Sequence, residues 1–197
     1  IGGEIYSYYS ALEAKIVTED GMCFSLATVF IENEENFVSK QDCEKKAFHR
    51  LAKILKERFP RLAMCFLLDG LYPDQNVLRV CEKNQWGYFI TLKDKCLPDV
   101  HEAARWQLED NPGQSVDYSP EPGVYQHLSW VFNMKHEGQR CHLLKCEETR
   151  ITPEGIEKKT FVWLCDARPD KNNAPQLAKE ARYRWKIEEA FNIQKNG

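Results

Sequence analysis

Two groups of residues in this sequence could bind a metal ion and the phosphates of a nucleic acid. Asp69 follows the apolar run LAMCFLL and precedes Gly70, so its carboxylate is expected at the carboxyl end of a strand, where α/β folds hold their ligands. Near the C-terminus, Arg184, Glu188 and Lys195 recur at a spacing that puts them on one face of a helix. Carboxylate oxygens are the ligands that Mg²⁺ prefers, and an Arg or Lys beside them suits phosphate oxygens.

Each group also has a simpler interpretation. A strand that ends in Asp-Gly most often forms only a turn, and Asp69 could have that role alone. Arg184 and Glu188, four residues apart, could form an ordinary ion pair that stabilises a helix by a few tenths of a kcal/mol. The residue types and their spacing therefore leave both a metal site and purely structural roles open.

The segments up to residue 92 predict a mixed α/β sheet. Runs rich in β-branched and aromatic residues indicate strands, and apolar residues at i, i+3 and i+4 indicate helices. The continuous apolar run that ends at Asp69 indicates a strand buried on both faces. In chain order the predicted elements are a hairpin of two strands over 5–17 and 22–32, a helix over 39–60 capped by Ser39 or Asp42, the buried strand over 61–70, a helix over 75–84 and a strand over 86–92.

The second half of the chain predicts a group of antiparallel strands and a closing helix. Polar loops with several prolines dominate residues 93–120. After them come three strand-like runs over 127–135, 140–149 and 158–167, and then a helix over 174–195. The predicted organisation is a core over 1–92, a loop-rich and β insertion over 93–170, and a helix over 171–197 that returns to the core.

Composition limits the classes of protein to which the chain can belong. Its 197 residues, 43% of them hydrophobic, suit one large domain or a domain with an insertion. No apolar stretch is long enough to span a bilayer and no signal peptide is present, so we expect a cytoplasmic protein without a membrane partner. The eight cysteines are scattered without a C-x-x-C pair and indicate free thiols in a reducing compartment. Net charge is −3, but basic residues outnumber acidic ones after residue 133, so a polyanion should meet mainly the C-terminal third.

The last helix resembles the Y-R-E-K signature of bacterial insertion-sequence transposases of the DDE class. That signature has a Tyr, two residues, an Arg, three residues, a Glu, six residues and a Lys. Arg184, Glu188 and Lys195 fall in this register, whereas Ala181 occupies the tyrosine position and the nearest tyrosine is Tyr183. Three further segments resemble the family in the family's order: YYSALEAKIV the strand after the first catalytic Asp, KQDCEKKAFHRL a helix, and LLDGLY the segment with the second catalytic Asp.

The resemblance implies an RNase H-like fold with an antiparallel β insertion before the helix that carries the catalytic Glu. It implies that Asp69 and Glu188 are catalytic metal ligands, and that Arg184 and Lys195 contact phosphate. Two Mg²⁺ ions would assist cleavage and transfer of DNA strands at the ends of a mobile element. The implied partners are double-stranded DNA, as terminal inverted repeats and target, and a second copy of the protein on that DNA.

Tryptophans of the insertion are further candidates for DNA contact. In related transposases that pass through a DNA hairpin, an aromatic residue of the insertion stacks on a base flipped out of the duplex. Trp163, which precedes Glu188, and Trp130 are candidates for this role. The alternative is that both belong to the core of the insertion. Trp185, next to Arg184, either packs against the sheet or lies near the substrate.

The first catalytic Asp of the family has no counterpart in this sequence. Glu4, Asp20 and Asp42 are the nearby acids, and none follows an apolar strand in the right place. We therefore expect a chain truncated before that residue, which alone binds metal weakly and does not cut DNA. The alternatives are a catalytically inactive remnant that binds DNA or a partner, another RNase H-like nuclease or recombinase, and a structural α/β domain in which Asp69 only makes a turn.

Overall fold

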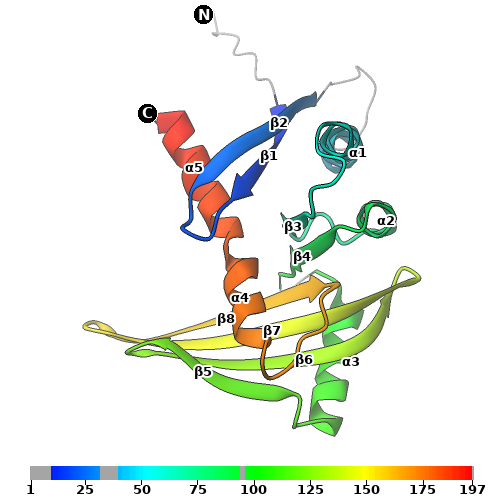
Figure 1. Ribbon diagram of the computed structural model, residues 1–197. Helices are drawn as coiled ribbons and strands as arrows, with labels where there is room; N and C mark the ends of the chain where they lie inside the picture. The colour runs from blue at the N-terminus through cyan, green and yellow to red at the C-terminus, as the bar shows by residue number, and fades with distance from the viewer. Residues whose placement is uncertain (1–9, 32–39, 94–95, 197) are drawn as a thin grey trace, which may run out of the picture. The chain divides into compact units, whose positions relative to one another are not determined.

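A computed structural model describes residues 10–31, 40–93 and 96–196, without the side chains of 40–43 and 194–196. The fold is mixed α/β, which confirms the class predicted from the sequence (Figure 1). The chain divides into two compact units, one of residues 1–62 with 189–197 and one of residues 63–188. Asp69, Trp163, Arg184 and Glu188 therefore belong to one unit, the second.

The first unit contains the predicted hairpin and the long helix after it. Strands β1 (Ser10–Val17) and β2 (Cys23–Ile31) pair antiparallel. Helix α1 (Lys40–Arg58) is tied to β2 by two arginines: Arg50 donates to the carbonyl of Phe30 at 3.0 Å and Arg58 to that of Leu26 at 3.4 Å. The predicted caps of this helix, Ser39 and the side chain of Asp42, lie outside the described residues.

The second unit is built on a six-stranded sheet in the order β3-β4-β8-β7-β6-β5. The first two strands run parallel and are connected by a helix, whereas every other neighbouring pair is antiparallel. The strands predicted as an insertion thus continue the sheet that β3 and β4 begin. The elements are β3 (Cys65–Leu68), α2 (Gln75–Asn84), β4 (Gly87–Thr91), β5 (Ser115–Glu121), β6 (Val124–His136), β7 (Gln139–Thr152) and β8 (Gly155–Cys165).

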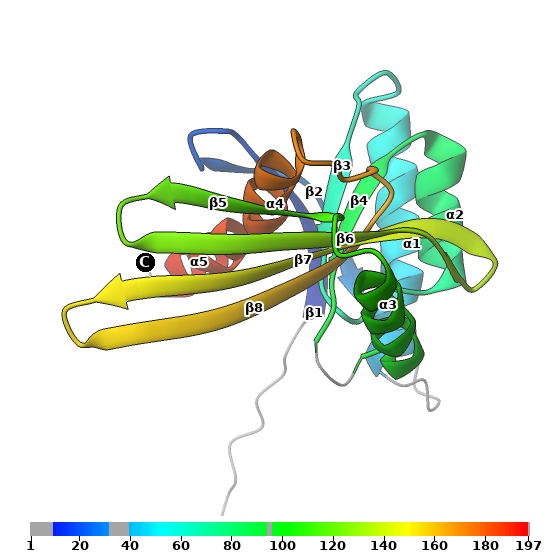
Figure 2. The same ribbon diagram turned by 90° about the horizontal axis from the view of Figure 1, so that it is seen from below.

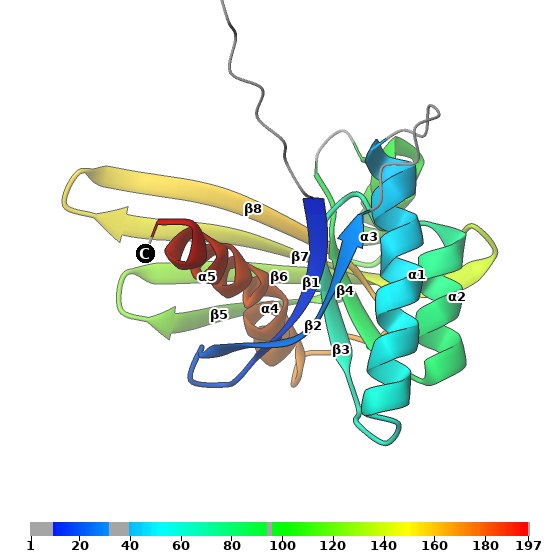
Figure 3. The same ribbon diagram turned by 90° about the horizontal axis from the view of Figure 1, so that it is seen from above.

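Alternate residues of this sheet meet different helices, because successive side chains of a strand point to opposite faces. Leu128, Leu144 and Trp163 pack with helix α4 (Ala174–Arg182), which lies on the face turned to the viewer in Figure 3. Their neighbours along the strands, which include Ser129 and Lys145, face helix α3 (Pro98–Asp110), seen in front of the sheet in Figure 2. The sheet of the second unit is therefore covered on both faces.

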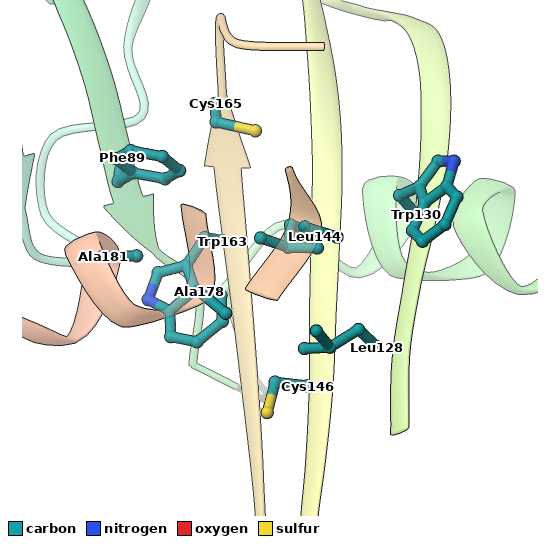
Figure 4. Close-up of a cluster of buried hydrophobic side chains, with 10 residues drawn as sticks. Phe89, Leu128, Trp130, Leu144, Cys146, Trp163, Cys165, Ala178 and Ala181 are labelled. Atoms are coloured by element: carbon teal, nitrogen blue, oxygen red, sulfur yellow. The ribbon is translucent and has the colours of Figure 1, made fainter. Parts of the chain in front are cut away.

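Trp163 lies within a hydrophobic core of the second unit (Figure 4). It is 2% exposed and stacks on Phe161, with ring centroids 5.8 Å apart and ring planes 5° apart. The fully buried residues of α4 that pack here are small: Ala174, Ala178 and Ala181. Because alanine side chains are short, the helix backbone can approach the aromatic layer closely without leaving a void.

Helix α3 is the main departure from the sequence-based prediction, which treated residues 93–120 as loops. Pro98 lies in the first turn of α3, where the missing N–H group of proline costs nothing. Val100 and Ala104, one turn apart, are buried on its inner side. The prolines of this segment therefore do not mark a loop throughout. Pro98 marks a helix start, Pro112 precedes β5, Pro120 lies within it and Pro122 follows it.

Two further predictions need correction. The strand predicted as buried on both faces is β3, four residues at the edge of the sheet, whose Cys65 is exposed and whose other residues are half-buried. The helix predicted over 174–195 is two helices, α4 and α5 (Arg184–Asn196), separated at Tyr183.

Among the described residues, no helix is both long enough and apolar enough to cross a membrane.

The buried position of Trp163 predicts a large loss of stability on truncation. Trp163→Ala should lower the free energy of unfolding by about 3–5 kcal/mol, because it removes a fully packed indole from the core. Chemical denaturation followed by circular dichroism measures this. The control is Trp106→Ala on α3, which is 57% exposed and should cost less than about 1 kcal/mol. Similar costs for the two variants would show that Trp163 does not hold the core.

Candidate functional site

Asp69 lies one residue beyond the carboxyl end of β3 and closes a tight turn. Its Oδ1 accepts a hydrogen bond from the backbone N–H of Leu71 at 2.9 Å, and its carbonyl accepts one from Tyr72 at 3.2 Å. A carboxylate that accepts the N–H two residues ahead is an Asx turn. Asp69 therefore stabilises a turn, which is the structural role expected from the Asp-Gly sequence. The turn uses one of the two oxygens of the Asp69 carboxylate.

The turn at Asp69 is in close contact with the end of β4. A Cβ atom placed on Gly70 would lie 3.1 Å from the carbonyl oxygen of Thr91, closer than ordinary van der Waals contact. The Sγ atom of Cys96 donates to the carbonyl of Gly70 at 3.3 Å. The carboxyl ends of the two parallel strands thus lie together, as expected for a pair joined by a helix.

Two residues beside Asp69 were not predicted from the sequence. Burial and the Asp69 carboxylate raise the pKa of the Cys96 thiol, and the nearby Lys93 ammonium lowers it in part. Both residues follow β4, on the segment that passes the end of β3. In the sequence, Lys93 and Cys96 come just after the strand predicted over 86–92, and this was the only sign of them. They are more than twenty residues from Asp69, so no helical or strand periodicity links them to it.

The predicted pair on the last helix is formed. In α5, the Arg184 guanidinium lies 2.7 Å from the Glu188 Oε1 atom, and the side chain of Arg184 is 18% exposed whereas that of Glu188 is 43% exposed. The same guanidinium lies 5.5 Å from the ring centroid of Trp185, within cation–π range. The pair has the geometry of an i,i+4 ion pair with its carboxylate partly open to solvent. The side chain of Lys195 lies outside the described residues.

A second ion pair, which the sequence did not reveal, fixes the helix just before Arg184. Arg182 donates to Oε2 of Glu148, which also accepts from Gln126 at 2.8 Å, and Arg150 approaches the other oxygen at 3.8 Å. The Arg182 guanidinium also lies 4.7 Å from the ring centroid of Phe161. We call Glu148, Gln126, Arg150 and Arg182 the Glu148 cluster. It attaches the C-terminal end of α4 to β6 and β7, and the contact of Arg182 with Phe161 adds β8.

Glu148 is ionised despite its burial. The side chain is 3% exposed, and burial on its own would raise its pKa. Hydrogen bonds from Gln126 and Arg182, with the charges of Arg182 and Arg150, outweigh burial and hold the pKa below the ordinary value of 4.5. The charged form is therefore the one that the fold stabilises.

The predicted DNA-facing tryptophans occupy the core. Trp163 and Trp130 are 2% and 3% exposed and share one hydrophobic cluster. Ala181, at the tyrosine position of the signature, is buried in the same cluster. Trp185 is 51% exposed, so its ring is the one of the three that solvent reaches.

The carboxylates of Asp69 and Glu188 are donors of the type that a hard divalent cation takes. Each has one oxygen occupied, by Leu71 N–H and by Arg184 respectively. In the part of the chain that the structure describes, no three His, Cys, Asp or Glu side chains gather as a metal site requires. The described residues therefore do not form a complete metal centre by themselves.

No protein-family model and no curated protein matches the chain.

Because Gly70 lies so close to the carbonyl oxygen of Thr91, adding a methyl group at position 70 should destabilise the fold. Gly70→Ala should lower the free energy of unfolding by about 1–2 kcal/mol, because either β3 or β4 must shift. Gly113→Ala is the control, since nothing lies within 4 Å of its added Cβ. That control should be neutral or stabilising by up to about 1 kcal/mol through the unfolded state. Equal effects of both substitutions in thermal unfolding would contradict the close approach.

The Glu148 cluster predicts a pH-dependent contribution to stability. Because the folded-state pKa of Glu148 is lowered, its contribution is present above about pH 4.5 and is lost as pH falls through the lowered pKa. Glu148→Gln should lower the free energy of unfolding by about 2 kcal/mol at pH 7. The difference in this free energy between the variant and the parent protein should become smaller as the pH falls. Urea unfolding at several pH values measures it. The control is Glu147→Gln, next in sequence and half-exposed, which should show neither effect. If the difference in unfolding free energy between Glu148→Gln and the parent protein stayed constant with pH, ionised Glu148 would be excluded as the cause.

Proposed function

We propose that this chain is part of the catalytic core of a DDE transposase with an RNase H-like fold, acting on DNA at the ends of a mobile element. Asp69 and Glu188 are the proposed metal ligands, and Arg184 and Lys195 the proposed phosphate contacts. The observation that carries the proposal is the Arg184–Glu188 pair, at 2.7 Å and in the register of the Y-R-E-K signature, within the same compact unit as Asp69.

The position of Asp69 supports the proposal. It follows the first of two parallel strands joined by a helix, and the carboxyl end of such a pair is where α/β sheets keep their ligand sites. The side chain of Lys93 lies near Gly70, the next residue, and adds a cation suited to a phosphate. An Asx turn occupies one carboxylate oxygen and leaves the second for another ligand.

The order of elements also supports the proposal. Between the strands near Asp69 and the helix that bears Glu188, the chain forms a group of long antiparallel strands, as the resemblance implies for the insertion. After these strands, α4 packs back onto Phe89 of β4. Asp69 thus follows a strand of the sheet on which α4 packs, and Glu188 lies on the helix that comes directly after α4.

Mg²⁺ is the proposed cofactor, and in such sites it activates the attacking oxygen and stabilises the leaving one. From this chain, Asp69 and Glu188 would hold it, and Arg184 would neutralise phosphate charge beside Glu188. The Glu148 cluster would keep Arg184 in place, because Arg182 is anchored two residues earlier. Trp163 has no part in this proposal, since it packs in the core.

The test is Glu188→Gln in the longest open reading frame that contains this segment, expressed whole and assayed on the terminal inverted repeats that flank it. Strand cleavage should fall by a factor on the order of 10⁴ while binding to the same DNA persists. The neighbouring Glu189→Gln is the matched control and should cleave normally.

Other results would point to the alternatives. Cleavage that survives Glu188→Gln would remove Glu188 from the triad and leave Arg184–Glu188 as a helix-stabilising ion pair. An unmodified protein that binds the repeats but never cleaves them, with no acidic residue after a strand upstream of this segment, would indicate an inactive remnant.

A further inference from the structure

A cavity lies between α3, the helix in front of the sheet in Figure 2, and the face of the sheet that it covers. The cavity has a volume of about 590 Å³, within the range of small-molecule pockets. Its walls come from α3, from the loop that follows it, and from strands β5 to β8. It is on the opposite face of the sheet from α4, so it is separate from the Glu148 cluster and does not depend on the proposed function.

Apolar side chains form the deep part of this cavity. Leu143 of β7 and Val162 of β8 are 2% and 8% exposed, and Ala104 of α3 is 4% exposed. Leu108, half-buried one turn further along α3, adds to the same wall. Contact with these side chains would remove apolar surface of a ligand from water, which favours the binding of an organic molecule.

The charged residues of the lining do not favour an ion of either sign. They are two cations and two anions, of which Lys145 and Glu147 pair with each other at 3.0 Å. Arg105 and Glu109 are exposed on α3, and Arg105 lies 3.9 Å from Glu102, outside the lining. A charged ligand would therefore lose its hydration without gaining an unpaired opposite charge inside the cavity. This lining selects for an uncharged molecule.

Uncharged polar groups remain open to such a molecule. Ser129 and Gln114 both line the cavity, and Ser129 is only 6% exposed. In the part of the chain that the structure describes, neither the Ser129 hydroxyl group nor the Gln114 amide has a hydrogen-bond partner. The Nε2 atom of His101 is also unpaired there, but protein atoms enclose it, so no ligand reaches it. Because buried polar groups are nearly always paired, the Ser129 hydroxyl calls for a partner from within the cavity.

We propose that this cavity binds a small uncharged molecule with an aromatic or alicyclic body and a hydroxyl group. The body lies against Ala104, Leu143 and Val162. The ligand hydroxyl forms a hydrogen bond with Ser129, in which either group can be the donor.

The first test compares two naphthalenes that differ in charge, with the whole chain. 2-Naphthylmethanol is uncharged and carries a hydroxyl group, whereas 2-naphthoate has the same rings and a negative charge. NMR follows the methyl signals of Leu143 and Val162 during titration. 2-Naphthylmethanol should move these signals saturably, with a dissociation constant on the order of 0.1 mM. 2-Naphthoate should bind at least about tenfold more weakly, because its carboxylate must be desolvated without a partner.

The second test isolates the hydrogen bond to Ser129. Ser129→Ala should weaken the binding of 2-naphthylmethanol by about fivefold, the loss expected for one hydrogen bond between uncharged groups. The same variant should bind 2-methylnaphthalene, which has no hydroxyl group, as the parent protein does. Thr160→Val is the matched control, because Thr160 is exposed on the same face of the sheet but does not line the cavity. It should bind both compounds normally.

The third test fills the cavity from α3, where a larger side chain does not alter the sheet. Leu108→Trp should weaken the binding of both uncharged naphthalenes by at least about tenfold, because the indole occupies their volume. Gln107→Trp is the control, since Gln107 is the exposed preceding residue and does not line the cavity. It should leave binding unchanged.

Four results would overturn the proposal. The first is the absence of saturable 2-naphthylmethanol binding up to roughly 1 mM. The second is binding of 2-naphthoate as tight as that of 2-naphthylmethanol, which would mean that the site accepts an anion. The third is unchanged 2-naphthylmethanol binding in Ser129→Ala. The fourth is an equal loss of affinity in Leu108→Trp and Gln107→Trp, which would place the compound outside the cavity.

Discussion

The pairing of β4 with β8 is the contact on which the second unit depends. Phe89, Ile90 and Thr91 lie opposite Cys165, Leu164 and Trp163, and this ladder joins the parallel strands to the antiparallel ones. It is reinforced at its end by the backbone N–H of Tyr88, which donates to Asp166 at 2.8 Å. Without it, the strand that ends at the Asp69 turn would be in a separate sheet from the one on which α4 packs, the helix just before the one that carries Glu188. With it, Phe89 and Trp163 enter one core, on which α4 packs.

The anchoring of α4 at its far end is electrostatic and complements the apolar packing at its start. Ala174 and Ala178 approach the aromatic layer, and Arg182 in the last turn meets Glu148. A cation at a helix C-terminus also interacts favourably with the helix dipole. A charge pair this far inside a protein is costly to desolvate, so its value lies more in fixing one position of the helix end than in net stability. Arg184 begins the next helix immediately beyond that fixed point.

Much of the fold could be predicted from the sequence because its signals are local. The hairpin, α1, α2 and the long strands follow from periodicity within a few residues, and Arg184 and Glu188 follow from helical spacing. Helix α3 was missed because its prolines, read as loop signals, mark its first turn and the residues after it. The partial exposure of β3 was missed because an apolar run does not tell an edge strand from a central one.

The residues missed at the candidate site share one cause. Glu148 and Arg182 are 34 positions apart and meet only because α4 folds back over β7. Lys93 and Cys96 reach the Asp69–Gly70 turn only because two parallel strands end at the same edge of the sheet. Interactions of this kind depend on tertiary structure, and no spacing along the chain encodes them.

The order in which the strands leave the ribosome has a consequence for how this protein reaches its native state. Tyr88 and Asp166 are 78 positions apart, so β4 is synthesised well before the strand that covers its open edge. At about 5–20 residues per second, that interval is several seconds. During this time an apolar strand with unpaired backbone groups is a template for pairing with another chain. Production of the protein at high concentration should therefore be limited by aggregation of nascent chains, and a chaperone that shields β4 during those seconds would relieve it.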